Sequence, residues 1–417
     1  MNYFTPIKTM TTNPPLSTRR RFLKTSAAAV AAPMVVPSRV FGANERITMG
    51  GIGMGGRGRS DLNGFLGFSE IQVLAVCDVV DSHAAQAKKS VDDRYGNGDC
   101  KVYKHHEDVL ARDDIDSVLI GTPDHWHAII SIDAMRSGKD VFCEKPECLT
   151  IREGQMMRDT ARSYGRVFSG GSQRVWGDYN WFHKMIYGGR IGQVEEAWID
   201  VGGPSGECYL EPMATPDEVE WDRWLGPAPW RPFHPTLIRG GFRPYRDYSG
   251  GGMTDWGCHV FGGAMFACNL HRTGPKEVIP PDGKDVKNLT FVFENGVKLY
   301  HKGGWGGQLS FKGSEGSIPG DNGRDRRSRP QAPDIHIPNY KGRGGLAGDF
   351  VHCVKTRERP FRDIELGQRT ATLCHLGNIA YWLNRPIKWD SVKEEIVGDA
   401  EAARWMDRPK RAPYNLG

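Results

Sequence analysis

The sequence lacks the cysteine spacing of a zinc site or a disulfide framework. Its nine cysteines are scattered, and no two of them form a Cys-x-x-Cys pair. Such pairs are typical of structural zinc sites and redox centres, so neither is expected here. His125 and His127 form a His-x-His pair, but no further ligand stands at a useful spacing, and we predict no metal. Cys77 and Cys143 end two apolar runs and are expected in the core.

The chain also lacks a hydrophobic run that is long enough to span a membrane. Its N-terminal apolar stretch, residues 27–36, is short and rich in alanine. The stretch follows Arg19-Arg20-Arg21 and precedes the small residues Gly42 and Ala43. Basic residues, an apolar segment and small residues in this order are typical of a twin-arginine export signal. We predict that residues 1–43 are such a leader and that the protein is exported to the periplasm.

Without this leader the chain has no excess of positive charge. The formal net charge is +5, and residues 1–42 hold six basic residues and no acidic one. Subtracting these six charges leaves −1, so the charge gives no reason to expect nucleic acid as a partner. The sequence has no internal repeats, and its 417 residues suffice for two globular domains.

A glycine-rich turn, Gly53-Met54-Gly55-Gly56-Arg57-Gly58, is the first positive signal. The apolar run before it, residues 47–52, predicts a buried strand, and residues 59–68 can continue as a helix. A strand, G-x-G-x-x-G and a helix together hold the pyrophosphate of a dinucleotide. The overlapping frame Gly51, Gly53, Gly56 also fits, but its strand is shorter. The glycines alone are weak evidence, because the chain holds 52 of them and such a loop can serve only as a turn.

Asp78 strengthens the dinucleotide prediction. It follows a second predicted strand, residues 71–77, and stands 20 residues after Gly58. At this distance an acidic residue accepts hydrogen bonds from the ribose hydroxyls. Its charge would repel the 2′-phosphate of NADP, so we expect NAD as the cofactor.

Helices and strands alternate up to about residue 170. After the first two strands the pattern predicts helices at residues 82–95, 128–137 and 150–164 and strands at 117–120, 140–143 and 167–168. This alternation predicts a Rossmann domain over residues 44–170, with a doubly wound parallel sheet and ligands at the carboxyl ends of its strands.

Residues 171–417 are predicted to form a second α/β domain with a largely antiparallel sheet. A strand is expected at residues 194–201 and a hairpin with an Asn-Gly turn at residues 291–300. An apolar helix is expected from about Gly250 to Leu270. Residues 319–347 are rich in Gly, Arg, Pro and Asp, which predicts a long loop that serves as a lid or as an arm between subunits.

Three side chains are candidates for the chemistry. Lys145 follows the strand at residues 140–143, so it lies at the sheet edge where the nicotinamide is expected. Its ammonium can hold a substrate hydroxyl, or help to remove the hydroxyl proton if burial lowers its pKa. Asp255 and His259 are four residues apart and share one face of a helix. Simpler roles stay open, because Lys145 can be a surface lysine and Asp255 a helix cap.

The glycine turn, Asp78, Thr122-Pro123, Glu144-Lys145-Pro146 and the Asp255-x-x-x-His259 spacing together resemble the Gfo/Idh/MocA oxidoreductases. The resemblance runs from about residue 45 to the C-terminus, and residues 221–227, rich in tryptophan and proline, resemble the exported branch of that family. Two departures stand out. Many relatives carry an aspartate where this chain has Gly262, and small apolar residues where it has Glu147-Cys148. The first departure is expected to alter substrate orientation.

The resemblance implies roles for particular residues. His259 would be the general acid and base, Asp255 would position it and the substrate, and Lys145 completes the catalytic set. Substrate contacts are expected from Lys145, Arg174, Asp255 and His259. The glycine turn and the resemblance together assign NAD contacts to Gly53, Met54, Gly55, Gly56, Arg57, Gly58, Asp78, Thr122, Pro123, Trp126, His127, Glu144, Lys145 and Gln173. His183 and Tyr248 are further candidates for reaching the substrate.

The expected function is an NAD-dependent oxidoreductase that acts on a hydroxyl of a carbohydrate or polyol, as a homo-oligomer (dimer or tetramer). Soluble NAD is scarce outside the cytoplasm, so we expect the NAD to stay bound and to be regenerated in each cycle. Two alternatives remain open. NAD-dependent glycosidases that resemble this fold oxidise a sugar transiently, eliminate the aglycone and reduce the sugar again. A non-catalytic sugar-binding protein would keep the fold without turnover.

Overall fold

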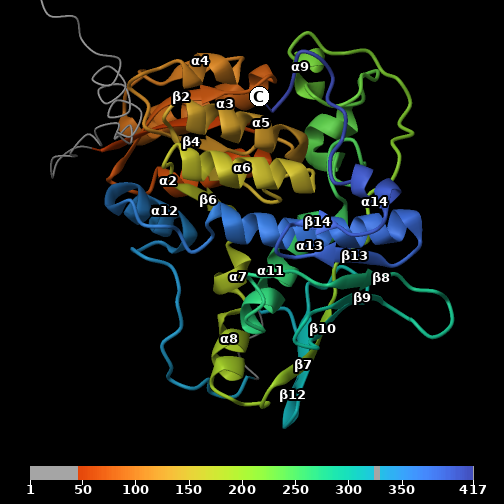
Figure 1. The fold of residues 1–417 in the computed structure, drawn as a ribbon. Helices are drawn as coiled ribbons and strands as arrows, with labels where there is room; N and C mark the ends of the chain where they lie inside the picture. Colours follow the sequence, from red (N-terminus) through yellow and green to blue (C-terminus); the bar gives the residue numbers. More distant parts are fainter. Residues whose placement is uncertain (1–45, 324–328, 417) are drawn as a thin grey trace, which may run out of the picture. The chain divides into compact units, whose positions relative to one another are not determined.

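The computed structural model describes residues 46–323 and 329–416, which form two sheets and the helices that cover them (Figure 1). The predicted export leader lies outside the described residues. Within them, no helix is long and apolar enough to cross a membrane.

The first sheet is parallel throughout and has the strand order β3-β2-β1-β4-β5-β6. The central strands β1, β4 and β5 consist almost entirely of buried residues, as expected for a sheet covered on both faces. The predicted doubly wound sheet is confirmed. Its strands are β1 (Ile47–Ile52), β2 (Ile71–Cys77), β3 (Lys101–Tyr103), β4 (Ser117–Ile120), β5 (Asp140–Cys143) and β6 (Phe168–Gly170).

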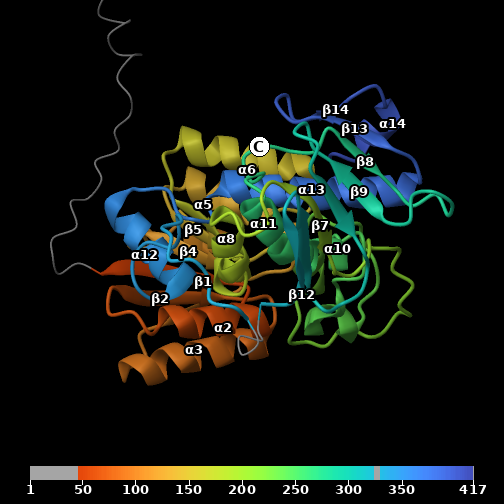
Figure 2. The same ribbon diagram turned by 90° about the horizontal axis from the view of Figure 1, so that it is seen from below.

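Helices α2 (Gly56–Phe65) and α3 (Asp81–Tyr95) cover one face of this sheet, and α5 (Asp124–Arg136) and α6 (Ile151–Ser163) cover the other (Figure 2). Helix α4 (His106–Leu110) packs beside α5 on that second face. A helix from much later in the chain, α12 (Gly345–Thr356), completes the first face. The Phe350 ring lies 5.9 Å from Phe65 and 5.8 Å from Phe142, centroid to centroid. The core of the Rossmann sheet therefore includes residues from the C-terminal part of the chain.

Two helices begin earlier than the sequence predicts. Helix α2 begins at Gly56 rather than residue 59, so the end of the glycine turn is already helical. Helix α5 begins at Asp124 rather than residue 128, directly after Pro123. Asp124 lies in the first turn, where a carboxylate is favoured by the helix dipole, whereas the apolar pattern starts only at Ala128. His125, Trp126 and His127 therefore lie on a helix and not in a loop.

The second sheet has eight strands in the order β12-β11-β7-β10-β9-β8-β13-β14. Only β7 and β10 pair in parallel, so the prediction of a largely antiparallel sheet is confirmed. The predicted Asn-Gly turn joins β9 to β10, with Gly296 at a φ of 85°. The strands are β7 (Val194–Ile199), β8 (Glu277–Ile279), β9 (Leu289–Val292), β10 (Lys298–His301), β11 (Leu309–Gly313), β12 (Gly316–Asp321), β13 (Ile387–Asp390) and β14 (Glu395–Ile396).

The apolar helix expected at residues 250–270 is divided into α10 (Gly252–Asp255) and α11 (Gly257–Ala267) at Trp256. The long loop expected at residues 319–347 is shorter at both ends, because β12 reaches Asp321 and α12 begins at Gly345. The remaining helices are α7 (Arg174–Gly177), α8 (Asn180–Tyr187), α9 (Trp221–Leu225), the single wide turn η1 (Leu237–Gly241), α13 (Ile364–Leu383) and α14 (Ala400–Arg404).

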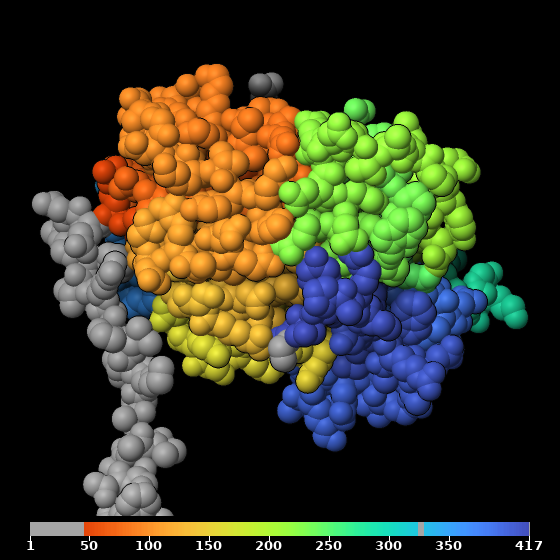
Figure 3. Space-filling view, turned by 90° about the horizontal axis from the view of Figure 1, so that it is seen from above, coloured from red at the N-terminus to blue at the C-terminus, as the bar shows by residue number. Residues whose placement is uncertain are grey.

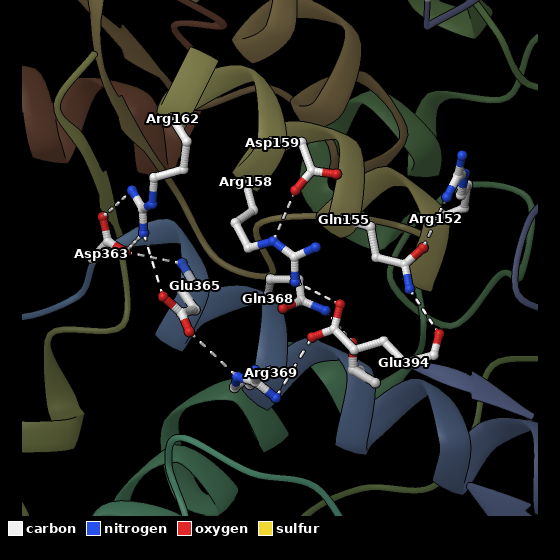
Figure 4. A network of polar contacts seen from close by, with 11 residues as sticks. Arg152, Gln155, Arg158, Asp159, Arg162, Asp363, Glu365, Gln368, Arg369 and Glu394 are labelled. Carbon is white, nitrogen blue, oxygen red and sulfur yellow. Dashed lines mark hydrogen bonds and ion pairs between the residues drawn. The ribbon is translucent and has the colours of Figure 1, made fainter. Parts of the chain in front are cut away.

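Helix α13 joins the two halves of the molecule. It packs against α11 and the second sheet, and also against α6 beside the Rossmann sheet. A side chain at Gly154 of α6 would collide with Gln368 of α13, so the two helices approach closely there. Figure 4 shows the polar network along this contact, which we call the α6–α13 seam. Its ion pairs join Arg162 to Asp363 and Glu365, Arg158 to Glu394, and Arg369 to Glu365 and Glu394.

Candidate active site

The glycine turn has two crowded and two open positions. A side chain at Gly53, which has a φ of 76°, would collide with the Thr122 backbone, and one at Gly58 would collide with the Gly53 carbonyl oxygen. A side chain at Gly56 would meet no protein atom within 4 Å, and one at Gly55 would only touch His83. The turn is thus closely packed against the sheet, with open space in front of it beside the start of α2. This is the shape that a pyrophosphate needs, so the residues fit a dinucleotide.

Asp78 holds this turn to the end of β2. Its carboxylate accepts hydrogen bonds from the backbone N–H groups of Met54, at 2.6 Å, and Val80, at 2.8 Å. The side chain is largely buried but lines the space in front of the turn. Asp78 therefore lies where the sequence predicts the acid that faces the adenosine ribose.

A cleft of about 300 Å³ opens along the carboxyl ends of the Rossmann strands. One wall comes from the glycine turn, Asp78 and the loops that follow β4 and β5, and the opposite wall comes from the second half of the chain. Figure 3 shows this part of the second half, in green, lying against the N-terminal half, in orange. Of the predicted site residues, the cleft is lined by Gly53, Gly55, Gly56, Arg57, Asp78, Thr122, Pro123, Trp126, Glu144 and Lys145.

The opposite wall is part of residues 218–243, which we call the covering segment. Its backbone pairs with the loop after β2, because Asp81 N–H donates to Glu218 O at 3.0 Å and Glu220 N–H donates to Val79 O at 2.9 Å. The Trp224 carbonyl accepts a hydrogen bond from Trp126 Nε1 at 3.1 Å. The residues of this segment that line the cleft are Arg223, Trp224, Leu237, Ile238, Arg239, Gly240, Phe242 and Arg243.

Lys145 and Asp255 form an ion pair beside the cleft. Lys145 Nζ donates to the backbone oxygen of Asp255 at 2.9 Å and makes a short contact with its carboxylate. Arg243 Nε contacts the same carboxylate oxygen at 3.1 Å. Burial by itself would raise the pKa of Asp255, but the charges of Lys145 and Arg243 outweigh it and lower that pKa below its ordinary value. Asp255 is therefore a carboxylate that anchors two cations.

His259 lies one turn further along, on α11, and is nearly fully buried. Its Nδ1 has no hydrogen-bond partner within the described residues. Burial, followed by the nearby charge of Lys145, lowers the pKa of His259 well below its ordinary value. The imidazole is therefore neutral at neutral pH and can accept a proton. Among the described residues, Lys145 reaches the cleft wall, whereas Asp255 and His259 do not line it.

His127 and Glu144 brace the loops that form the cleft. The two ring nitrogens of His127 lie 2.7 Å from the Pro146 oxygen and 2.8 Å from the Thr122 oxygen, so this residue connects the loops after β4 and β5. Glu144 contacts the Arg57 guanidinium at 2.9 Å and accepts a hydrogen bond from the Lys145 N–H at 3.2 Å. His127 therefore supports the cleft from behind, while Glu144 ties Arg57 of the glycine turn to the Lys145 loop.

Other predicted residues lie apart from the cleft. Gln173 and Arg174 do not line it in the described structure, and Arg174 pairs with Asp178 at 2.5 Å and lies 4.6 Å from the Trp256 ring. His183 and Tyr248 are fully buried and do not line it either. Arg174 thus acts in the packing around α11.

The two departures from the family pattern, Gly262 and Glu147, are both enclosed by neighbouring residues. A side chain at Gly262 would meet Val175 and Thr370, so this position is enclosed by neighbouring helices. Glu147 is fully buried, and burial raises the pKa of its carboxyl group. It occupies the space that Gly170 and Gly367 leave free. Both positions therefore belong to the packing behind the cleft.

Asp124 and Arg243 are among the cleft residues that were missed from the sequence. Asp124 lies in the first turn of α5, and burial raises the pKa of its carboxyl group to about 6. Because Asp124 directly follows Thr122-Pro123, which was predicted to contact NAD, its place beside the cleft could have been predicted from the sequence. Arg243 stands in an irregular segment 12 residues before Asp255, and no periodic pattern marks it. Among the described residues, no group of three or more His, Cys, Asp or Glu side chains could hold a metal ion.

Two family models match the chain. Residues 47–172 match the oxidoreductase family NAD-binding Rossmann fold, and residues 198–416 match the oxidoreductase family C-terminal alpha/beta domain. The chain belongs to the Gfo/Idh/MocA oxidoreductase family, and its N-terminal half is an NAD-binding domain.

Two curated relatives illustrate the sequence similarity. The chain is 34% identical to an alpha-N-acetylgalactosaminidase of Shewanella oneidensis over 172 residues, which cover 34% of this chain and 36% of that protein. It is 32% identical to a glycosyl hydrolase family 109 protein of Saccharopolyspora erythraea over 208 residues, or 42% of this chain and 44% of that protein. In both cases the match spans less than half of the relative.

Solved structures share the fold over most of the chain. An aldose-aldose oxidoreductase from Caulobacter crescentus complexed with glycerol superposes with a TM-score of 0.59 at 17% identity, covering 82% of this chain and 100% of that one. Myo-inositol 2-dehydrogenase from Lactobacillus plantarum superposes with a TM-score of 0.58 at 16% identity, covering 82% and 99%. At these identities the likeness establishes the fold.

Proposed function

We propose that the protein is an NAD-dependent oxidoreductase that acts on a hydroxyl group of a carbohydrate or polyol. The observation that carries this proposal is the position of Lys145, which reaches the wall of the dinucleotide cleft and is anchored by Asp255, with the neutral His259 close by. Family membership supports the redox chemistry.

The bound NAD supplies a hydride acceptor for a carbon that bears a hydroxyl group. The residues of this chain then handle the hydroxyl. Lys145 donates a hydrogen bond to the hydroxyl oxygen and stabilises the negative charge that develops on it as the proton leaves. His259, kept neutral by burial and by the charge of Lys145, receives the proton. Asp255 stays ionised and holds Lys145 in place.

We also propose that the NAD stays bound between turnovers. The covering segment supports this, because its backbone pairs with the loop after β2 and its side chains Leu237, Ile238 and Phe242 line the cleft opposite the Rossmann strands. A dinucleotide held under this segment leaves only when the segment moves. Retention would suit a protein exported by the twin-arginine route to the periplasm, where no large pool of NAD exists. Assembly as a dimer or tetramer remains part of the proposal.

A redox-neutral glycosidase is the second candidate, and the glycosyl hydrolase family 109 relatives favour it. In such a reaction a sugar hydroxyl is oxidised to a ketone, which acidifies the C–H bond on the neighbouring carbon. Loss of that proton and of the aglycone gives an unsaturated sugar. Water then adds, and the ketone is reduced back to the alcohol, so the net reaction is hydrolysis. A non-catalytic sugar-binding protein is the third possibility, and the intact set of Lys145, Asp255 and His259 argues against it.

Lys145→Ala tests the catalytic proposal. We expect turnover to fall by about two orders of magnitude or more, because the group that holds the hydroxyl is lost. Bound NAD should be nearly unchanged, and Lys89→Ala, on the exposed face of α3, serves as the control. Unchanged turnover would remove Lys145 from the mechanism.

Mass spectrometry of the purified protein tests retention and distinguishes the two reactions. We expect stoichiometric NAD without any added cofactor. A panel of sugars and glycosides is then incubated with the holoprotein in the absence of free NAD. Bound NADH that accumulates selects the oxidoreductase, and release of an aglycone without net NADH selects the glycosidase. A protein that is isolated empty and needs excess free NAD contradicts retention.

A further inference from the structure

We propose that the substrate sugar carries an acidic substituent, a carboxylate or a sulfate ester, which is bound by Arg239 and Arg243 at the mouth of the cleft. This inference rests on the proposed function of the same site and specifies its substrate class. It comes from an imbalance of charge that is confined to one end of the cleft.

Six Lys or Arg side chains line the cleft, and four of them have a close carboxylate partner. The fifth, Arg243, shares the carboxylate of Asp255 with Lys145. The sixth, Arg239, has no ion pair among the described residues. The four paired cations are Arg57 with Asp61 and Glu144, Lys104 with Asp81, Arg223 with Glu107, and Lys145 with Asp255.

Arg243 is held in a fixed position with part of its guanidinium free. Its Nε contacts Asp255 and its Nη1 donates to the Gly240 oxygen at 2.9 Å, while the Phe242 ring lies 4.9 Å from its Cζ. The side chain remains 38% exposed. A guanidinium that is anchored through one edge can offer its other edge to a carboxylate or a sulfate as a bidentate donor.

Arg239 begins the same turn, four residues before Arg243. Gly240, between them, has a φ of 91°, a conformation that favours glycine, and the turn is closed by the contact of Arg243 with the Gly240 oxygen. Arg239 lines the cleft and is exposed to solvent. The two cations are thus carried by one short turn, and an anion bound there would neutralise the charge of Arg239, which has no ion pair among the described residues.

Two of the three carboxylates that line the cleft are committed elsewhere, and the third, Asp124, is buried, which raises the pKa of its carboxyl group, while the charge of Arg243 acts against this rise. Asp78 accepts hydrogen bonds from the backbone N–H groups of Met54 and Val80, and Glu144 pairs with Arg57. The pyrophosphate of NAD belongs at that turn, with the N-terminus of α2 and Arg57. Arg243, in contrast, is tied to the carboxylate that anchors Lys145, so it lies beside the group that would hold the sugar hydroxyl.

Binding to the holoprotein tests this inference without requiring turnover. The probes are methyl glycosides of the gluco and galacto series in three forms: neutral, with a C6 carboxylate, and with a 6-sulfate. Quenching of tryptophan fluorescence reports occupancy, because Trp126 and Trp224 line the cleft. We expect at least one acidic probe to bind about tenfold or more tightly than its neutral counterpart, with an advantage that shrinks as salt is added. Comparison of the affinities for the carboxylate probe and the sulfate probe shows which of the two acidic groups the site binds.

Arg239→Gln should abolish this advantage and leave the binding of neutral glycosides and the NAD content unchanged. Arg190→Gln, an exposed arginine outside the cleft, is the matched control. Equal binding of neutral and acidic probes overturns the inference. So does an Arg239→Gln protein that loses NAD but keeps its sugar preference, because the cation then serves the cofactor.

The readouts separate this inference from the proposed function. Absorbance of bound NADH is followed in the same samples. Acid-selective binding without any redox change or aglycone release would contradict the proposed activity and leave the acidic ligand standing. Turnover of neutral sugars without any preference for acidic ones would support the proposed activity and contradict the acidic ligand.

Discussion

The two halves of the chain make several contacts, and two of them differ in character. The α6–α13 seam joins two regular helices through a network of ion pairs that includes the nearly buried Glu394 (Figure 4). The covering segment is mostly irregular and is held at the loop after β2 by a short stretch of backbone pairing, at α5 by hydrogen bonds to the Trp224 carbonyl, and at α4 by the partly exposed ion pair of Arg223 with Glu107. The seam lies away from the cleft, whereas the covering segment forms one of its walls.

This difference indicates that the two contacts serve different purposes, stability in one case and ligand exchange in the other. Charges removed from water are costly to separate, so the seam should keep the two halves together. Hydrogen bonds of a short irregular segment open at much lower cost, and segments of that kind move when ligands enter. We therefore expect changes at the seam to affect stability, and changes in the covering segment to affect NAD exchange.

The largest expected effect is at the seam. Glu394→Gln keeps the shape of the side chain but leaves Arg158 and Arg369 without their shared charge partner. We expect a loss of about 3 kcal/mol in the free energy of unfolding, measured by denaturant titration. Glu395→Gln, at the exposed neighbouring glutamate, is the control and should change little. A faster release of NAD with unchanged stability would contradict the assignment of the seam.

The second effect concerns the covering segment. A side chain at Gly226 would collide with the Trp126 ring, so Gly226→Ala should displace this segment from α5. We expect bound NAD to dissociate about tenfold faster or more, measured by nucleotide release on dilution and filtration. Gly189→Ala is the control, because Gly189 also has a positive φ but open space around it. Equal release rates in the two variants would show that backbone strain, and not the covering segment, sets retention.

The third prediction concerns Asp78, which would accept hydrogen bonds from the adenosine ribose of NAD. A 2′-phosphate would bring its negative charge close to the Asp78 carboxylate, so NAD should bind to the emptied protein about tenfold more tightly than NADP. Asp78→Asn should narrow this ratio, whereas Asp93→Asn, on the exposed side of α3, should not. Titration of each protein with both nucleotides measures the ratio, and a preference of the native protein for NADP would contradict the role of Asp78.

The smallest effect is a dependence of stability on pH, which comes from buried histidines on α5, α8 and α13. Burial lowers the pKa of His125, His183 and His375 to about 4. Because these values lie below the ordinary pKa of histidine, the folded state binds fewer protons than the unfolded state. Stability is therefore fully present above about pH 6.5 and is lost as the pH falls toward 4.

At pH 6 each of these histidines should lower the free energy of unfolding by about 1 kcal/mol relative to its value at high pH. His375→Gln, which can still donate to the Cys148 oxygen, should flatten the decline of melting temperature between pH 8 and pH 5. His336→Gln, at an exposed histidine, is the control. An unchanged slope for His375→Gln would show that this histidine does not drive the acid sensitivity.

Much of the Rossmann half could be predicted because its signals are local. The strands at residues 47–52, 71–77, 117–120 and 140–143 are short apolar runs ended by turn residues, and each forms as predicted. The glycine turn and Asp78 could be paired through their spacing alone. Helix starts were less certain, since Asp124 to His127 are polar or aromatic and carry no apolar period although they begin α5.

The covering segment could not be predicted, because its partners are distant in sequence and its backbone follows no period. Nothing in residues 218–243 indicates that their backbone would pair with the loop after β2. For the same reason Arg243 was missed, and Gln173 and Arg174 were assigned to a cleft that they do not line in the described structure.

The sequence by itself predicted the two sheet types and the dinucleotide turn, since these depend on local pattern and spacing, and its resemblance to the family singled out Lys145, Asp255 and His259. Only the tertiary structure decided how those groups act together. It tied Lys145 and Arg243 to one carboxylate, kept His259 neutral by burial, and brought the covering segment across the cleft. Charge and burial depend on neighbours that the chain supplies from far away in the sequence, and folding alone brings them together.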